Sequence, residues 1–301
     1  MLTSLTPANQ QFVRDIDRLS EQMRTAQQQI STGKRIHTIA DDPDQISTLL
    51  QARADLEGSR VTSANLGRVQ SEVDAGEQAI QSGVKLFERV RTLGAAGTSD
   101  TSSAETRAAL AQEVAAIYEE LVGLTNTTVE GRFIFSGDQD QVSPYQLDLT
   151  KTPPLSAYGG SAATRQVQHP NGTTFPVSRT AQEIFDSTDP STNVFKAVDA
   201  LRIALQANDR TGIRTAVQNL DKPDIFLNRQ LSFYGTTQQR IADAKEFGSR
   251  YQLQLQTQIG AIEDADTTYA ILTLSQAKVN QQAAFEAHAQ IPHGSLFDFL
   301  R

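Results

Sequence analysis

The first thirty residues carry a narrow hydrophobic stripe on a polar background. Beyond Phe12 the apolar positions recur every three or four residues, and Gln, Arg, Asp, Glu, Ser and Thr dominate between them. Only an α-helix brings such positions onto one face, and so narrow a stripe is typical of a coiled-coil seam. A single terminal helix cannot bury this stripe, so another segment must cover it. The stripe comprises Leu5, Phe12, Ile16, Leu19, Met23, Ala26 and Ile30.

Two further helical patterns follow the first. The first helix is expected to end near Gly33, because glycine adopts the positive φ that closes a helix at little cost. The run 41–44, Asp-Asp-Pro-Asp, then predicts a helix start, since Asp caps free amides and Pro fits a first turn. We interpret these acids as a cap, because a Ca²⁺ site would need further oxygen ligands at defined spacing. Helical periodicity runs on to about Leu93, and again from Ser103 to Thr128.

The periodicity changes after Glu130. Residues 132–190 hold six of the ten prolines, and Asn171-Gly172 favours a tight hairpin turn. Segments 164–168 and 173–178 are predicted to be short strands. Asn171 also begins a glycosylation sequon, which the hairpin turn explains adequately. We therefore expect a small, exposed β-rich insert, low in strong core residues.

Helical patterns return after residue 190. They cover 193–206, 209–220 and a longest stretch near Asp224 to His288, roughly 100 Å if unbroken. Its predicted seam includes Leu227, Tyr234, Ile241, Leu255, Tyr269, Leu272, Val279 and Ala283. The two ends of the chain can therefore cover each other's stripes.

The predicted fold is mainly α with a β-rich insert. The N- and C-terminal segments form an elongated antiparallel helical bundle around a small central β domain. Four parts are expected, divided by role. They are an N-terminal coiled-coil assembly segment (1–40), a helical bundle domain (41–131 with 190–270), a β-rich outer domain (132–189) and a C-terminal assembly segment (271–301).

Composition narrows the class of protein. With 6% aromatic residues and no Trp in 301 residues, the chain suits thin helices with narrow seams better than a thick core. A net charge of -8 without a basic block argues against nucleic-acid binding. No apolar run approaches the length of a membrane span. The absence of Cys excludes disulfides and thiolate sites, and the first residues lack the pattern of a conventional secretory signal.

No constellation of catalytic residues stands out. The four histidines, at positions 37, 169, 288 and 293, lack metal-binding spacing with a third ligand nearby. The sequence holds neither a glycine-rich phosphate loop nor a nucleophile elbow, and its carboxylates are scattered along helix faces. We therefore predict no catalytic, metal-binding or cofactor-binding residues, no cofactor and no enzymatic activity.

Motifs at both ends of the chain resemble one known family. Residues 19–36 followed by Ala-Asp-Asp-Pro at 40–43 look like the terminal signature of the flagellin-like axial proteins of the bacterial flagellum. Within that family, the Asp-Asp-Pro run, the segment 126–137 and the ending 295–300 resemble the branch at the hook–filament junction more than flagellins. The resemblance covers about residues 1–140 and 220–301, and Phe133 and Phe299 stand where tyrosine is more usual.

The resemblance implies a function and a set of partners. It implies a structural adaptor at the hook–filament junction, exported through the flagellar type III channel without a cleaved signal to an extracellular location. The implied partners are further copies of the chain in a ring, hook-associated protein 1, flagellin and an export chaperone. The apolar C-terminal tail is a sensible binding site for the chaperone, because masking it would prevent premature association.

A heptad stripe is usually only a core, but terminal segments are normally frayed in isolation. We therefore expect the terminal seams to contact other subunits after assembly. Two other functions stay open: a flagellin, which would be abundant in sheared flagella, and a non-flagellar secreted coiled-coil protein. The predicted assembly interface is Leu5, Phe12, Ile16, Leu19, Met23, Ile30, Leu272, Val279, Leu296, Phe297, Phe299 and Leu300.

Overall fold

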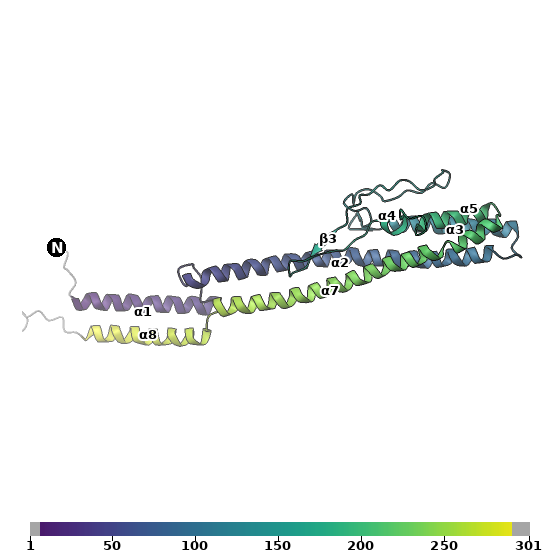
Figure 1. Ribbon diagram of the computed structural model, residues 1–301. Helices are drawn as coiled ribbons and strands as arrows, with labels where there is room; N and C mark the ends of the chain where they lie inside the picture. Colours follow the sequence, from purple (N-terminus) through teal and green to yellow (C-terminus); the bar gives the residue numbers. More distant parts are fainter. Residues whose placement is uncertain (1–6, 291–301) are drawn as a thin grey trace, which may run out of the picture. The chain divides into compact units, whose positions relative to one another are not determined.

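The computed structural model describes residues 7–290, which divide into two compact units (Figure 1). The first unit holds α1, α8, the start of α2 as far as Gly58 and the end of α7 from Gln252. The second unit is formed by residues 59–251. The helices are α1 (Pro7–Thr32), α2 (Pro43–Gly97), α3 (Ala104–Thr125), α4 (Ala181–Phe185), α5 (Val194–Gln206), α6 (Arg210–Gln218), α7 (Asp221–Glu263) and α8 (Thr267–Ala289). The strands are β1 (Thr128–Val129), β2 (Arg132–Phe133), β3 (Gln166–Gln168) and β4 (Thr174–Pro176).

The predicted end of α1 and start of α2 are confirmed. Gly33 follows α1 with a φ of 71°, the left-handed conformation that glycine adopts without strain. In the loop that follows, the side chain of Asp41 accepts hydrogen bonds from the backbone amides of His37 and Thr38, both 2.7 Å long. Asp42 caps α2, because its carboxylate accepts from the amide of Gln45. These acids therefore organise the backbone, as the capping interpretation requires.

The long C-terminal pattern is not one helix. It divides into α7 and α8 at residues 264–266, where two backbone hydrogen bonds tie the chain to the loop after α1. The Arg35 amide donates to the Glu263 carbonyl at 2.6 Å, and the Ala265 amide donates to the Gly33 carbonyl at 2.8 Å. Asp266 then caps α8. The capping potential of that Asp is the sequence signal for the break, but the continuous apolar spacing on either side obscures it.

The unit of residues 59–251 has a closed hydrophobic core. α2 and α7 run antiparallel through it, with Gln70 meeting Lys245 and Arg91 meeting Asp221. α3 begins one residue after its predicted start, capped by Ser103. The third helix packs against α5. The large side chains of its interior are almost completely buried: Phe87, Tyr118, Leu121, Phe135, Tyr145, Phe185, Phe195 and Tyr234.

A tight hairpin accounts for the change of periodicity after Glu130. β1 and β2 pair antiparallel, with Val129 opposite Arg132. The two residues between them, Glu130 and Gly131, both have positive φ, 51° and 77°. That is the pattern of the two-residue turn that best matches strand twist. The predicted strand-like run therefore pairs for only two residues before the chain turns inward.

The predicted strands of the insert are confirmed as β3 and β4. They pair antiparallel with Val167 opposite Phe175, and Gly172 has a φ of 91° in the connecting turn. The rest of the insert consists mainly of loops. Gly137, with a φ of 64°, lies where a Cβ would come within 2.4 Å of the Ser161 carbonyl oxygen, so only glycine fits there.

The expectation that the insert is poor in core residues and exposed is wrong for its central side chains. Ile134, Phe135 and Tyr145 are buried and belong to the same core as the helices. Ion pairs reinforce this packing, because Glu72 of α2 binds both Arg132, at 3.2 Å, and Arg165. The expected four-part division by role stays a prediction.

Candidate assembly surface

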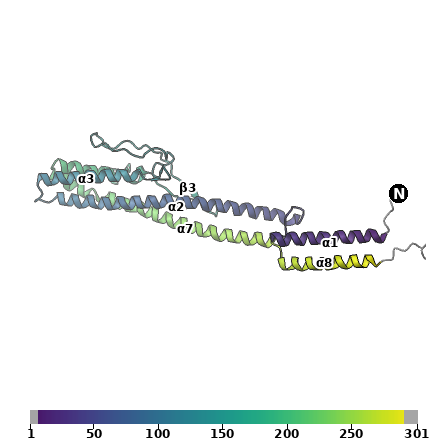
Figure 2. The ribbon, with the colours of Figure 1, turned by 180° about the vertical axis from the view of Figure 1, so that it is seen from behind.

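α1 and α8 lie side by side in both views of the chain (Figure 1 and Figure 2). The predicted N-terminal stripe lies in this contact. Leu19 and Ala26 are buried there, and Phe12, Ile16, Met23 and Ile30 are half-buried. The C-terminal segment therefore covers the N-terminal stripe, as predicted.

The face of α8 toward α1 is built from small and half-buried residues. Ala270 and Ala277 are buried, and Leu274 and Ala284 are half-buried at the same helical spacing. Small residues let two helices approach closely. At the far end of the pair, the Phe12 ring stacks on His288, with ring centroids 4.0 Å apart.

Leu272 and Val279, which were predicted to lie in the seam between the terminal segments, are on the face of α8 turned away from α1. Leu272 and Val279 follow Ala270 and Ala277 by two residues each, which is about 200° around a helix, so they point away from α1. Leu272 is 67% exposed and Val279 is 60% exposed. The larger apolar residues were expected in the seam, whereas the buried residues of α8 in the intramolecular contact are Ala270 and Ala277. Leu272 and Val279 form, with Tyr269 and Ile271, an exposed apolar face on α8, here called the outer face.

The two helices of the pair differ on their outward sides. The described part of α1 exposes one large hydrophobic residue, Val13, among polar ones. α8 is apolar on both faces, a property typical of helices that are buried on both sides. Contiguous exposed apolar patches on a soluble chain mark interaction sites. The outer face is therefore the best candidate assembly surface among the described residues.

A buried carboxylate fixes the base of this helix pair. The side chain of Glu263 is 4% exposed and forms ion pairs with Lys34, from the loop after α1, and Arg53 of α2. Burial is the largest influence and raises the pKa of Glu263. The hydrogen bonds from Lys34 and Arg53 together outweigh it, so the net pKa lies below its ordinary value. This cluster holds the helix break in place.

Five of the predicted interface residues lie outside the described part of the chain. They are Leu5, Leu296, Phe297, Phe299 and Leu300.

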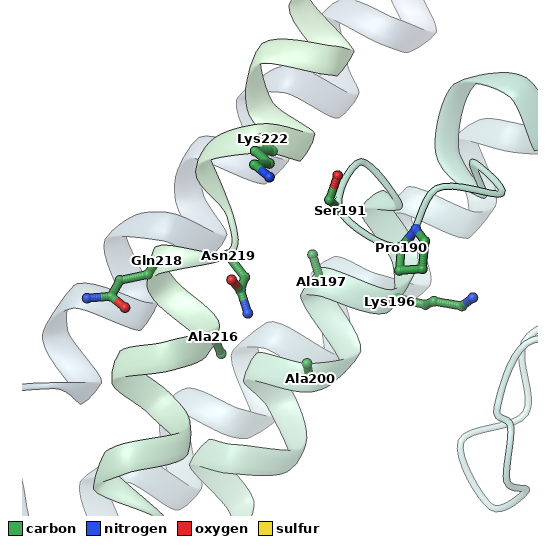
Figure 3. A pocket seen from close by; sticks show the side chains of 9 residues that line it. All are labelled: Pro190, Ser191, Lys196, Ala197, Ala200, Ala216, Gln218, Asn219 and Lys222. Carbon is green, nitrogen blue, oxygen red and sulfur yellow. The ribbon is translucent and has the colours of Figure 1, made fainter.

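A hollow of the second unit has no catalytic arrangement among its described lining residues. It measures about 410 Å³ and lies between α5, α6 and the start of α7 (Figure 3). Lys196 and Lys222 border it together with Ser191 and Asn219, and no carboxylate or histidine lines it. Residues 7–290 also contain no group of three potential metal ligands and no helix long and apolar enough to cross a membrane.

Comparison with known families agrees with the helical ends of the fold. The family model of the bacterial flagellin N-terminal helical region matches residues 5–140. The family model of the bacterial flagellin C-terminal helical region matches residues 214–300. The chain belongs to the flagellin family. The two matched regions contain α1 to α3, α7 and α8, and only residues 141–213 lie between them.

Two relatives that match along most of this chain are flagellar hook-associated proteins. Flagellar hook-associated protein 3 of Escherichia coli (strain K12) is 26% identical over 97% of this chain and 97% of its own length. Flagellar hook-associated protein 3 of Salmonella typhimurium is 24% identical over 91% of this chain and 92% of its own. By contrast, a B-type flagellin of Pseudomonas aeruginosa is 29% identical over only 43% of this chain and 26% of its own.

A solved structure supports the fold. The flagellar junction protein FlgL from Legionella pneumophila superposes with a TM-score of 0.57 at 13% identity, over 72% of this chain and 99% of that one. The predicted family resemblance and the predicted fold class are confirmed.

Proposed function

We propose that this flagellin-family chain is a structural adaptor at the hook–filament junction of the bacterial flagellum, on which the flagellin filament assembles. The observation that carries the proposal is the match to hook-associated protein 3 along 97% of both chains, beside flagellin matches confined to less than half of this chain. If this chain were a flagellin, its matches to known flagellins would be expected to extend over most of both chains.

The adaptor acts by contact alone. It has no active site and needs no cofactor, because its task is to mate two differently packed helical lattices. The outer face of α8 is the surface that neighbouring subunits cover. Burying each large side chain, such as Leu272 and Val279, contributes about 1.5–3 kcal/mol. That gain offsets the cost of ordering the terminal segments on assembly.

The proposed partners follow the position in the flagellum. Further copies of the chain lie beside it in a ring, hook-associated protein 1 lies on the hook side, and flagellin lies on the filament side. The chain reaches this extracellular site through the flagellar type III channel without a cleaved signal peptide.

An export chaperone is proposed to bind the C-terminal tail, residues 295–301, before export. A pull-down of the full chain and of a chain lacking these residues tests this point. Binding should be lost with the tail, and binding that survives the deletion would place the chaperone elsewhere.

Labelled antibody on intact flagella tests the junction proposal. The label should form one band at the hook–filament boundary, and deletion of the gene should release monomeric flagellin into the medium. Label along the whole filament would identify a flagellin. Unaffected motility after deletion would indicate a secreted protein outside the flagellum.

A further inference from the structure

The unit of residues 59–251 has a concentrated basic hollow on α7. It measures about 500 Å³ and follows one face of the helix, where Phe226, Gln230 and Phe233 lie at helical spacing. Arg229 and Arg240 flank it from α7, and neither forms an ion pair with any described residue. Arg179 comes from the segment after β4 and lies over the Phe233 ring, 4.5 Å from its centroid. Three guanidinium groups thus gather on a chain whose net charge is -8.

Two polar atoms at this hollow have no hydrogen-bond partner within residues 7–290. Gln230 is only 3% exposed, yet its side-chain oxygen Oε1 is unpaired. The Nε of Arg179 is buried and unpaired as well. A buried polar atom without a partner costs about 1–3 kcal/mol. The hollow, here called the arginine hollow, is therefore incomplete in the single chain.

The complementary charges lie elsewhere on the same helix pair. Asp74 and Glu77 of α2 are half-buried and both accept hydrogen bonds from the Nε2 atom of Gln238, at 2.8 and 2.6 Å. Within the described part of the chain, no lysine or arginine forms an ion pair with either carboxylate. Like charges three residues apart on a helix repel each other. The described part of the single chain therefore supplies no cation to this acidic pair.

The arginine hollow and the acidic pair face opposite ways. Arg229 and Gln238 are nine residues apart on α7, which is two and a half turns, so their side chains leave opposite sides of the helix. Arg240 is two residues from Gln238, about 200° around the axis. One chain therefore cannot join its own two surfaces, but two chains placed side by side can.

We propose that the arginine hollow of one copy of this chain docks on the Asp74–Glu77 pair of the next copy. The contact is of the head-to-tail kind, because it joins two different surfaces and leaves one free on each side. Such contacts repeat around a ring or along a helix. Arg229 and Arg240 supply the cation that the acidic pair lacks, and the neighbour's chain covers the hollow. The inference rests on the proposed function, since it names the lateral contact within the junction ring.

Cysteine cross-linking in intact flagella tests the contact directly. The chain has no Cys, so every thiol is one that was introduced. Gln78→Cys stands beside the acidic pair, and Thr236→Cys lines the arginine hollow; both positions are exposed. The full-length double variant should give disulfide-linked dimers and longer ladders under mild oxidation. Either single variant should give no ladder. Gln78→Cys with Gln112→Cys, an exposed position on α3, is the matched control and should stay monomeric.

Charge exchange decides whether the ion pairs drive the contact. Arg229→Glu with Arg240→Glu should lower the cross-linking yield at least tenfold, and adding Asp74→Arg with Glu77→Arg should restore it. Because the acids are half-buried, Asp74→Asn with Glu77→Gln serves as a milder pair that keeps the hydrogen bonds to Gln238, and it should lower the yield in the same direction.

The outcomes separate this contact from the proposed function. Antibody label at the junction without any ladder overturns the contact and leaves the junction assignment standing. Cross-linking of the Thr236→Cys chain to another protein overturns the contact too. So does a cross-linking yield that stays the same in the charge-exchange variants. Label away from the junction overturns the proposed function, whatever the ladder shows.

Discussion

The two units of the chain treat their large apolar residues in opposite ways. In residues 59–251 the biggest side chains are inside, and Tyr118, Phe185 and Phe195 make ring contacts with centroids less than 6 Å apart. In the terminal pair, alanines face inward on α8 while Leu272 and Val279 face outward. The first arrangement is a finished core. The second leaves an apolar face uncovered, as in one half of an interface. Folding and assembly therefore depend on different parts of the chain.

The largest effect is expected from removing the terminal pair altogether. A chain lacking residues 1–32 and 267–301 loses α1 and α8 but keeps the core of the second unit. It should remain a soluble, folded monomer with an unchanged thermal midpoint for that unit, and filament attachment should be abolished. Circular dichroism and a motility assay measure the two effects. Unfolding of the remainder, or attachment that persists, would contradict the division of roles.

Phe195→Ala should break the closed core. Phe195 is buried against Tyr118, Tyr145 and Phe185, and large-to-small changes at such sites cost about 3–5 kcal/mol. The free energy of unfolding of the second unit, measured by urea titration, should fall by that amount, and the urea midpoint should fall with it. A change below 1 kcal/mol would mean that the aromatic cluster does not hold the unit together.

Glu263→Gln should loosen the base of the terminal pair. Its partners are half-exposed, so solvent screening limits the loss of stability to about 1–2 kcal/mol at pH 7. The pKa of Glu263 is lowered in the folded chain, so its contribution is present above the ordinary value of 4.5 and lost as the pH falls through the folded value. The gap between parent and variant should therefore close below about pH 4.5. A gap that stays constant with pH would show that the charge is not the cause.

The smallest effect on stability is expected at the outer face of α8. Leu272→Gln and Val279→Gln change exposed positions, so the free energy of unfolding should move by less than about 0.5 kcal/mol. Assembly should nevertheless fail, with flagellin released into the medium. Ala277→Gln is the matched comparison, because that residue is buried against α1 and its change should destabilise the pair within one chain. Normal filaments with a chain that carries both Leu272→Gln and Val279→Gln would show that the outer face is not part of the interface.

Much of the fold follows from residues that act locally. Gly33, Asp42 and Ser103 mark helix ends through backbone conformation and capping, which depend on a few neighbours. The stripe of Phe12, Ile16 and Leu19 follows from helical geometry alone. These features were predictable because their causes lie within a few residues in sequence.

The features that sequence reasoning missed depend on distant contacts. The break between α7 and α8 is fixed by hydrogen bonds to Gly33 and Arg35, more than two hundred residues earlier. The inward choice of Ala270 over Leu272 depends on how closely α1 approaches. Insert residues such as Phe135 are buried because the helices of the second unit meet them, which no local pattern records.

The central claim is that the outer face of α8 is exposed in the free chain and covered in the flagellum. Val279→Cys tests it most directly, with Thr150→Cys in the exposed insert loop as the control, since the chain has no other thiol. Both thiols should react quickly with a maleimide in the free chain. In intact flagella, position 150 should stay reactive and position 279 should be protected at least tenfold. Equal reactivity at position 279 in both states would contradict the account.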